Sequence, residues 1–541
     1  MNSPPRFSLP APLEGRALAL LLAIYLLVGV VGHPPWRGDD LTYLGPIHWM
    51  MTHGEWLLPQ IAGQPFYDYP PLYYWTGALL GKALGWALPL HDAARLASPL
   101  FAGLALYWTG LTARRLSGPH VFAPTILLGM GSLGLVVHAH ETQPMLALLA
   151  GCALCYAGLA RINQHPWPGA LEAGLGIGMA GLSAGLPGLG LTLPILFLAP
   201  LICPICRHPR TLAALLAALG LGLSLVFCWV AALGVFYPEQ QLIWWHRELQ
   251  DNLPHLTHLL HPSKLLALLG WFAWPVWPIA GWTVWQQRRK LNTPGLLIPL
   301  SASVLALFLV ATTGSVRPAS TLPILPPLVL LAAYGVGSLR RGAANAFDWF
   351  GLVTFTVFTL VIWAGWSALY FGWPPGLGRQ LLKLAPHFSR QLQPGTVALG
   401  AGLSLAILIL PSLTRRSPAR ASTNWALGAT LLWCLAVCLW QPWFAHTKNY
   451  QSIAQALAEK IAQGPSGCVA ETGLGDTQKA GLAYFSGIMT KEFTKDTDCH
   501  LILVYGSGSN TQIVAGGWDM IWERRLGGGR RSETFRLYRR D

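Results

Sequence analysis

The chain has 541 residues, of which 53% are hydrophobic and 11% charged, whereas soluble domains carry about 25% charged residues. Apolar runs close to the roughly 20 residues that cross a bilayer recur along most of its length. The composition excludes an ordinary soluble enzyme and predicts a polytopic membrane protein. The formal charge of +14 does not indicate a nucleic-acid partner, because Lys and Arg fall in short clusters between the apolar runs.

The apolar runs predict about thirteen transmembrane helices and therefore an all-α membrane module. The first run follows Arg6 and Arg16 as in a signal peptide, but no small-x-small cleavage site follows it, so we expect a retained span. The glycine-rich residues 181–190 would form the turn between the fifth and sixth spans. The runs cover approximately residues 17–32, 94–116, 120–138, 143–161, 170–185, 187–203, 211–235, 265–285, 294–313, 321–339, 349–372, 397–412 and 423–441.

The basic clusters predict the orientation of these spans. They all fall on one side if the N-terminus is cytoplasmic, as the positive-inside rule requires. The loops 33–92, 237–264 and 373–395, and the tail from residue 444, then face outward.

The first long loop, residues 33–92, contains the adjacent carboxylates Asp39 and Asp40 and, further on, Asp68 among tyrosines and prolines. A carboxylate beside hydrocarbon costs free energy unless it is solvated, paired or functional. Asp40 would equally serve as the cap of a helix that begins there. The aromatic residues of the loop predict short helices in the interface plane, or an aromatic belt that only anchors the fold.

The tail, residues 444–541, predicts a small α/β domain separate from the membrane module of residues 1–443. An amphipathic stretch at 450–461 precedes strand-like runs at 468–470 and 501–505. Cys468 and Cys499 lie at the starts of these runs, so on an oxidising outer face we expect a disulfide between them. The alternative is a pair of unlinked core cysteines.

The stretch RGDDLTYLGPIHWMMTHGEWLLPQIAGQPFYDYPPLYYWTGALL resembles the first outer loop of the GT-C membrane glycosyltransferases. The similarity is to the bacterial aminoarabinose lipid A transferases and their protein O-mannosyltransferase relatives. Later segments follow in the family's order, namely HDAARLASPLFAGLALYWTGLTARRL, HPSKLLALLGWFAWPVWP and GSVRPASTLPILPPLVLLAAYG. The resemblance covers essentially the whole length.

The resemblance implies an inverting transfer of a sugar from a polyprenyl phosphate to a lipid A-like, glycan or protein acceptor. The reaction would occur at the periplasmic face of a bacterial inner membrane. A carboxylate must take the proton of the acceptor hydroxyl while the leaving phosphate is stabilised. Asp39 takes the position of the family's catalytic aspartate, Asp40 is its neighbouring acid, and Glu141 would line the cavity beside them.

The resemblance also implies substrate-binding and metal-binding residues. The substrate-binding set comprises Tyr43, Tyr67, Tyr69, Tyr73, Arg95, Arg247, Lys264 and Arg317. A divalent ion would be held by Asp68 and His261, although an interfacial histidine without metal is the more frequent outcome. The chain departs from the family where cations are expected, with Tyr69, Ala184 and Val316 at those positions.

Two further function classes stay open, a flippase or transporter and a non-catalytic binding subunit for a lipid-linked sugar. The sequence has no obvious internal repeat, no charge pair within a span and no P-loop, which disfavours transport. The missing cations favour a binding subunit. We expect membrane lipids as partners and a monomeric protein.

Overall fold

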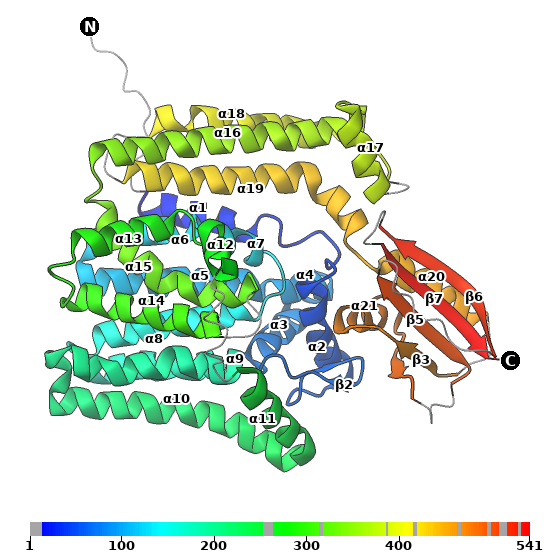
Figure 1. Ribbon diagram of the computed structural model, residues 1–541, viewed down its shortest axis with the longest axis horizontal. Coiled ribbons are helices and arrows are strands. Elements are labelled where there is room, and N and C mark those ends of the chain that lie inside the picture. The colour runs from blue at the N-terminus through cyan, green and yellow to red at the C-terminus, as the bar shows by residue number, and fades with distance from the viewer. Residues whose placement is uncertain are drawn as a thin grey trace, which may run out of the picture.

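The computed structural model describes residues 13–252, 263–312, 317–385, 388–414, 419–463, 467–494, 499–507, 517–527 and 532–540. A large helical body carries a small five-stranded sheet domain at one end (Figure 1). The predicted helical membrane fold with a small α/β domain at the C-terminus is therefore confirmed.

The helical body consists of long helices with shorter ones between them. The 3-10 helix η4 (Ala319–Ile324) leads directly into α15. The helices are α1 (Gly15–Leu27), α2 (Asp39–His53), α3 (Leu72–Leu84), α4 (Leu90–Arg95), α5 (Ala97–Ser117), α6 (Phe122–Met130), α7 (Leu133–His138), α8 (Met145–Arg161), α9 (Pro166–Ile202), α10 (Pro209–Phe236), α11 (Pro238–Asn252), α12 (Ser263–Phe272), α13 (Val276–Gln286), α14 (Pro294–Thr312), α15 (Leu325–Val336), α16 (Arg341–Phe371), α17 (Pro375–Leu384), α18 (Pro394–Leu413) and α19 (Arg420–Thr447).

Seven helical stretches within the described residues are long and apolar enough to cross a membrane. There are eight if α12 and α13, which meet at a bend of 101°, count as one broken span. Four shorter apolar helices accompany them. The predicted spans fall on apolar helices, on half of α9 or on the α12–α13 pair, except that the span predicted at 120–138 is divided between α6 and α7. The count of thirteen crossings stays a prediction.

Helix α9 is two antiparallel segments rather than one rod. Its backbone leaves helical geometry at Ala184 and at Gly185, where φ is +56°. A Cβ on Gly188 would lie 2.0 Å from the carbonyl oxygen of Ala180, whereas residues eight apart in a straight helix are about 12 Å apart along the axis. The chain therefore reverses within the glycine-rich segment that the sequence predicted as a turn.

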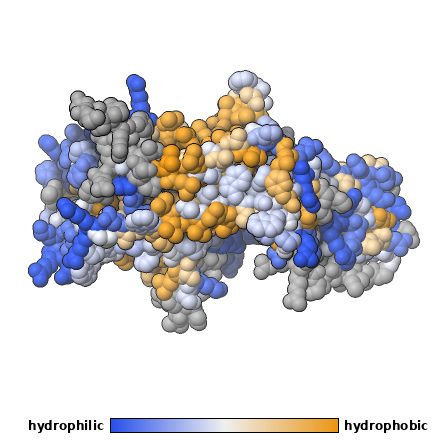
Figure 2. All heavy atoms as spheres, turned by 90° about the horizontal axis from the view of Figure 1, so that it is seen from above, coloured by the Kyte–Doolittle hydropathy of each residue, from blue (hydrophilic) through white to orange (hydrophobic). Residues whose placement is uncertain are grey.

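A band of hydrophobic surface covers the middle of the helical body and is flanked by hydrophilic ends (Figure 2). Large apolar side chains of α16 and α18 are exposed to the surroundings, among them Val353, Leu360, Val361, Leu405 and Leu408. Exposed apolar area of this extent is costly in water and indicates contact with lipid. The protein is thus a multi-pass membrane protein.

The first loop folds into α2, α3, α4 and a two-stranded hairpin of β1 (Gln60–Ile61) and β2 (Gln64–Pro65). The sheet domain packs onto it through α21 (Asp476–Ser486), which contacts α2. Lys479 donates a hydrogen bond to Gln64 at 2.9 Å, and Tyr484 bonds to the ring of His91 at 2.7 Å. The loop and the outer domain therefore form one packed unit.

The sheet domain follows α19, which continues to Thr447, slightly beyond the predicted boundary. The strand order is β4–β3–β5–β7–β6, with β3 parallel to β4 and β5 and the remaining pairs antiparallel. Helix α20 (Gln451–Ala462) and α21 complete it. The strands are β3 (Val469–Thr472), β4 (Thr490–Glu492), β5 (Leu501–Ser507), β6 (Trp518–Leu526) and β7 (Glu533–Arg540).

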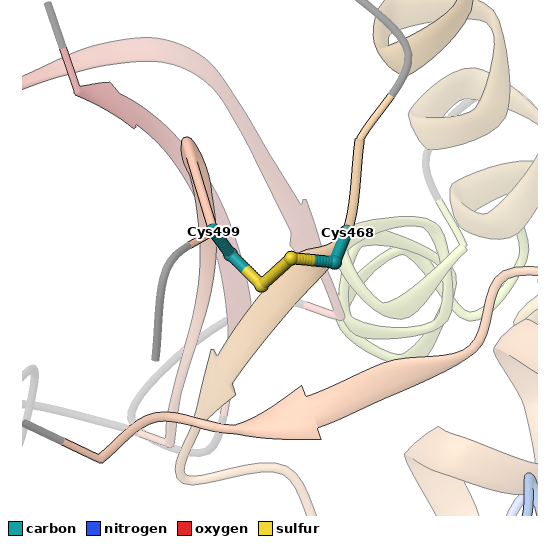
Figure 3. Close-up of a disulfide and its surroundings, with 2 residues drawn as sticks. All are labelled: Cys468 and Cys499. Atoms are coloured by element: carbon teal, nitrogen blue, oxygen red, sulfur yellow. A yellow bond between two sulfur atoms is a disulfide. The ribbon is translucent and has the colours of Figure 1, made fainter. Parts of the chain in front are cut away.

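Cys468 and Cys499, which flank the paired strands β3 and β5, form a disulfide with a Cα–Cα distance of 5.2 Å (Figure 3). The bond spans 31 residues of sequence. It ties the start of the domain to its central strand.

Replacing both cysteines by serine should destabilise the sheet domain by about 3–4 kcal/mol, because a closed loop of this length restricts the unfolded chain. Limited proteolysis of the purified protein should then cut first after α19. The exposed Cys228 of α10 offers a control, since Cys228→Ser should leave the digestion pattern unchanged. Equal resistance of wild type and double variant would contradict this role of the disulfide.

Candidate functional site

The two adjacent carboxylates at the start of α2 have different environments. Asp40 is 1% exposed, and its two oxygens accept hydrogen bonds from Arg95, from the backbone of Trp36, and from the backbone and hydroxyl of Thr142, at 2.7–3.1 Å. Burial alone would raise the pKa of Asp40, but the Arg95 charge and the hydrogen bonds from Arg95 and Thr142 outweigh it and hold the pKa at about 2. Asp40 is thus a structural group that is charged at neutral pH.

Arg95 is fully buried, and four of its five guanidinium N–H groups are hydrogen-bonded within the protein. Besides Asp40, its guanidinium bonds Asp92 at 3.0 Å and the carbonyl of Val30 at 2.6 Å. It does not line the cavity described below, where the substrate contact predicted for Arg95 would be made.

Asp39 is half-buried and much less constrained than its neighbour. Within the described residues its side chain accepts one hydrogen bond, from Gln143 Nε2 at 3.1 Å, and has no ion pair. It begins α2 directly after Gly38, whose φ of +107° lets the chain turn there. Asp39 therefore has carboxylate lone pairs left for a substrate.

Glu141 lies in the segment between α7 and α8, next to these acids. Its carboxylate pairs with the ring of His138. Burial raises the pKa of Glu141, the His138 hydrogen bond and charge oppose this rise, and the charges of Asp40 and Asp39 add to it. Glu141 thus lies near the two aspartates and is engaged by His138, but the cavity described below is not lined by Glu141, which was predicted to line it.

A cavity of about 550 Å³ opens beside this loop. Its polar residues come from the first loop, from α11 and from the start of η4, and its apolar residues from α8, α9, α14 and η4. The residues that line it are Tyr67, Asp68, Tyr69, Met145, Leu148, Ala184, Pro187, Leu191, Arg247, Glu248, Gln250, Asp251, Asn252, Leu309, Val310, Arg317, Ser320 and Pro323. A charged end joined to an apolar end suits a lipid that bears a phosphate.

The charged end carries both signs. The guanidinium of Arg247 lies 4.9 Å from the centre of the Tyr67 ring, and Arg247 and Arg317 both act electrostatically on Asp68. Loss of bulk water and the charge of Asp476 raise the pKa of Asp68, while the two arginines lower it. The arginines are thus close enough to this wall to act on an anionic ligand.

Glu248 lines the cavity and was not predicted from the sequence. It is 5% exposed and accepts a hydrogen bond from the backbone N–H of Leu186 at 2.5 Å, where α9 reverses. Burial raises the pKa of Glu248 to about 7, although the hydrogen bonds from Leu186 and Asn252 lower it. The only feature of the sequence that could have indicated Glu248 is its position next to Arg247 in the predicted outer loop 237–264.

Three further residues of the predicted substrate-binding set, Tyr43, Tyr73 and Lys264, do not line the cavity. Tyr43 is buried against Tyr69, with ring centres 5.5 Å apart, and the hydroxyl of Tyr73 bonds to Ser98 at 2.6 Å, so both hold the loop together. Lys264 is exposed at the start of α12. Tyr67, Tyr69, Arg247 and Arg317 do line the cavity.

The predicted metal ligands are not brought together by the described residues. Asp68 lines the cavity, whereas His261 lies outside the described residues. No group of three or more His, Cys, Asp or Glu side chains within the described ranges is arranged to hold a metal ion. The metal site stays a prediction.

The whole chain can be compared with solved membrane proteins. It aligns with the crystal structure of ArnT from Cupriavidus metallidurans bound to undecaprenyl phosphate, with a TM-score of 0.67 and 15% identity over 96% of this chain and 97% of that one. The chain has the GT-C fold. The apo structure of the same ArnT gives a TM-score of 0.64 and 18% identity over 88% of this chain and 85% of that one.

This GT-C chain also has relatives by sequence. The undecaprenyl phosphate-alpha-4-amino-4-deoxy-L-arabinose arabinosyl transferase of Pseudomonas savastanoi pv. phaseolicola is 27% identical over 446 residues, which are 78% of this chain and 77% of the relative. An enzyme of the same name from Pseudomonas fluorescens is 31% identical over 120 residues, 22% of this chain and 20% of the relative. No protein-family model matches the chain. The predicted resemblance to the aminoarabinose lipid A transferases is confirmed.

Asp40→Asn should destabilise the protein by about 3 kcal/mol or more, because it leaves a buried guanidinium with one carboxylate partner fewer. Asp39→Asn is the matched control and should melt like the wild type. Melting of the detergent-purified variants measures both. Equal melting of the two variants would refute a structural role for Asp40.

The pH dependence of the protein's stability follows from the lowered pKa of Asp40. Its stabilising contribution is complete above the ordinary carboxyl pKa of 3.8 and is lost as the pH falls toward about 2. Between pH 3.8 and about 2, the melting temperatures of the wild type and of Asp39→Asn should fall further than that of Asp40→Asn. Parallel pH profiles for all three proteins would contradict the assignment.

Proposed function

We propose that this chain is a membrane glycosyltransferase that moves a sugar from a polyprenyl phosphate to a hydroxyl group of a lipid A-like acceptor, with Asp39 as the general base. The observation that carries the proposal is the contrast between the two acids. Asp40 accepts five hydrogen bonds from its surroundings, whereas Asp39 accepts one and keeps free acceptor capacity. Asp39 does not line the cavity itself, but its charge acts on Tyr69, which does.

The lining of the cavity supports a lipid-linked donor. Its apolar side chains, such as Leu148, Leu191 and Leu309, suit a polyprenyl tail, and Arg247 and Arg317 suit its phosphate. These arginines would take over from the cations that the family has at the positions of Tyr69, Ala184 and Val316. The names of the sequence relatives, which are undecaprenyl phosphate-aminoarabinose transferases, support the same donor class.

The proposed reaction is a single displacement. Asp39 accepts the proton of the acceptor hydroxyl as its oxygen forms a bond to the anomeric carbon of the sugar. The bond from that carbon to the phosphate oxygen breaks on the opposite face, so the configuration inverts. The polyprenyl phosphate leaves with the bonding electrons, and Arg247 and Arg317 stabilise its charge. Gln143 orients Asp39 through its amide N–H.

The proposed location is a bacterial inner membrane, with the N-terminus cytoplasmic and the sheet domain periplasmic. The basic clusters beside the spans, such as Arg114–Arg115 and Arg288–Lys290, support this orientation. The disulfide between Cys468 and Cys499 suits an oxidising compartment. A divalent ion at Asp68 with His261 remains part of the family expectation and carries no step here.

Asp39→Asn should lower transfer by at least about 100-fold, because general-base catalysis contributes roughly 10²–10⁴ in rate. Transfer from radiolabelled undecaprenyl phosphate-aminoarabinose to lipid A, with purified protein, measures this. Glu239→Gln is the control, since Glu239 is an exposed acid of α11 outside the cavity lining. Full activity of Asp39→Asn would remove the proposed base.

Arg247→Gln and Arg317→Gln should each weaken donor binding about tenfold or more, because each removes charge-assisted hydrogen bonds to phosphate. Equilibrium binding of undecaprenyl phosphate measures the effect. Arg288→Gln removes an arginine that also stacks on an aromatic ring, Trp285, and serves as the matched control. Unchanged affinity in both cavity variants would exclude them as the phosphate clamp.

A further inference from the structure

A second hollow, of about 410 Å³, lies where the helical body meets the sheet domain. We call it the junction groove. It shares no lining residue with the larger cavity. It is lined by Leu384, Ala385, His446, Thr447, Asn449, Gln451, Ser452, Gln455, Arg524, Arg525, Leu526 and Gly527, which belong to the end of α17, the end of α19, α20 and the end of β6.

The junction groove carries excess positive charge. Arg524 and Arg525 line it, and none of its described lining residues is a carboxylate. Nearby Glu523 is shared between Arg525 and Arg536, at 2.9 and 2.8 Å. The side chain of Arg524 is exposed and has no ion pair within the described part of the chain. Two guanidinium groups thus share one carboxylate, and Arg524 adds a third positive charge, which leaves charge for an anion.

The groove borders a short helix that combines basic and exposed apolar side chains. Helix α17 has Arg379 and Lys383 one turn apart, and its Leu377 and Leu384 are exposed. A basic amphipathic helix of this kind lies in the headgroup region of a bilayer. Leu384 itself lines the groove. In Figure 1, α17 leads from the end of α16 toward the sheet domain.

The position of the groove relative to the membrane also follows from the surface. The apolar band over α16 and α18 gives way to hydrophilic surface toward the sheet domain (Figure 2). Polar groups of α20, from Ser452 and Gln455, face the groove together with the arginines. The groove thus lies on the hydrophilic side of the apolar band.

We propose that the junction groove binds the phosphate of an anionic membrane lipid, whose acyl chains lie against the apolar band. Guanidinium groups bind phosphate through paired N–H donors, and Ser452 and Gln455 supply neutral donors. The site stands independently of the glycosyl transfer. The groove is nevertheless connected to the first loop. Lys448 lies between the lining residues Thr447 and Asn449, and its carbonyl accepts a hydrogen bond from the backbone N–H of Arg37 at 2.6 Å. Arg37 is two residues before Asp39.

Native mass spectrometry of the full-length protein tests this proposal, after reconstitution in nanodiscs of phosphatidylcholine with a minor fraction of phosphatidic acid. The wild type should retain phosphatidic acid in preference to phosphatidylcholine. The double variant Arg524→Gln/Arg525→Gln should retain about tenfold less of it, because two phosphate-binding guanidiniums are lost. The experiment does not require turnover.

The matched control is Arg539→Gln/Arg540→Gln, which removes two exposed arginines from β7 at the far end of the same sheet. It changes the net charge equally and should retain lipid like the wild type. Equal loss in both double variants, or no loss in either, would overturn the proposal. A preference for inorganic phosphate, seen as its binding without selective retention of phosphatidic acid, would overturn the lipid assignment.

Discussion

The geometry of the outer face depends on one buried ion-pair network. Arg95, at the end of α4, bonds Asp40 of α2, Asp92 of its own helix and the carbonyl of Val30 after α1. Asp40 in turn accepts a hydrogen bond from the backbone N–H of Thr142, before α8, and Asp92 accepts one from the backbone N–H of Gly32. A buried charge is tolerated only when it is fully paired. The network therefore joins residues 30–32, α2, α4 and the segment before α8, and it engages Asp40 while leaving Asp39 outside it.

The sheet domain reinforces this arrangement from outside. Glu533 of β7 pairs with Arg37 at 3.1 Å and accepts from the hydroxyl of Tyr450 at 2.6 Å. The hydroxyl of Thr42 bonds to that of Thr477 at 2.5 Å, which joins α2 to α21. The first turn of α2, which carries Asp39, is thus held by Arg95 and by the sheet domain. Such support would keep Asp39, the proposed base, in place without consuming its lone pairs.

Much of this fold could be predicted from hydropathy, because a bilayer demands long apolar segments and leaves little choice of structure. The turn within α9 was visible as a glycine-rich segment, and the helix and two strands of the tail as short periodic runs. Strands β6 and β7 were not predicted, because WDMIWERRL and ETFRLYRR carry charges where an alternating apolar pattern was sought. Their pairing is set by the sheet rather than by local pattern.

The site was predictable only in part. The sequence placed Asp68, Tyr69 and Arg317 in outer loops, and these residues do meet around the cavity. The family resemblance distinguished Asp39 from Asp40, but the residues alone did not, since the physical difference lies in a partner of Asp40, Arg95, 55 residues away. The same limit explains Arg95 and Tyr73, which looked like ligands for a substrate and instead bind protein groups. Glu248 was missed because its importance comes from the backbone of Leu186, and no side-chain motif records that contact.

The central claim is that this chain transfers a sugar from a polyprenyl phosphate with inversion. The most direct measurement is the product of purified protein given undecaprenyl phosphate-aminoarabinose and lipid A, with its anomeric configuration read by NMR. The account predicts a new glycosidic bond of configuration opposite to that of the donor. Binding of the donor without transfer, movement of the donor between leaflets without a product, or a product of retained configuration would contradict it.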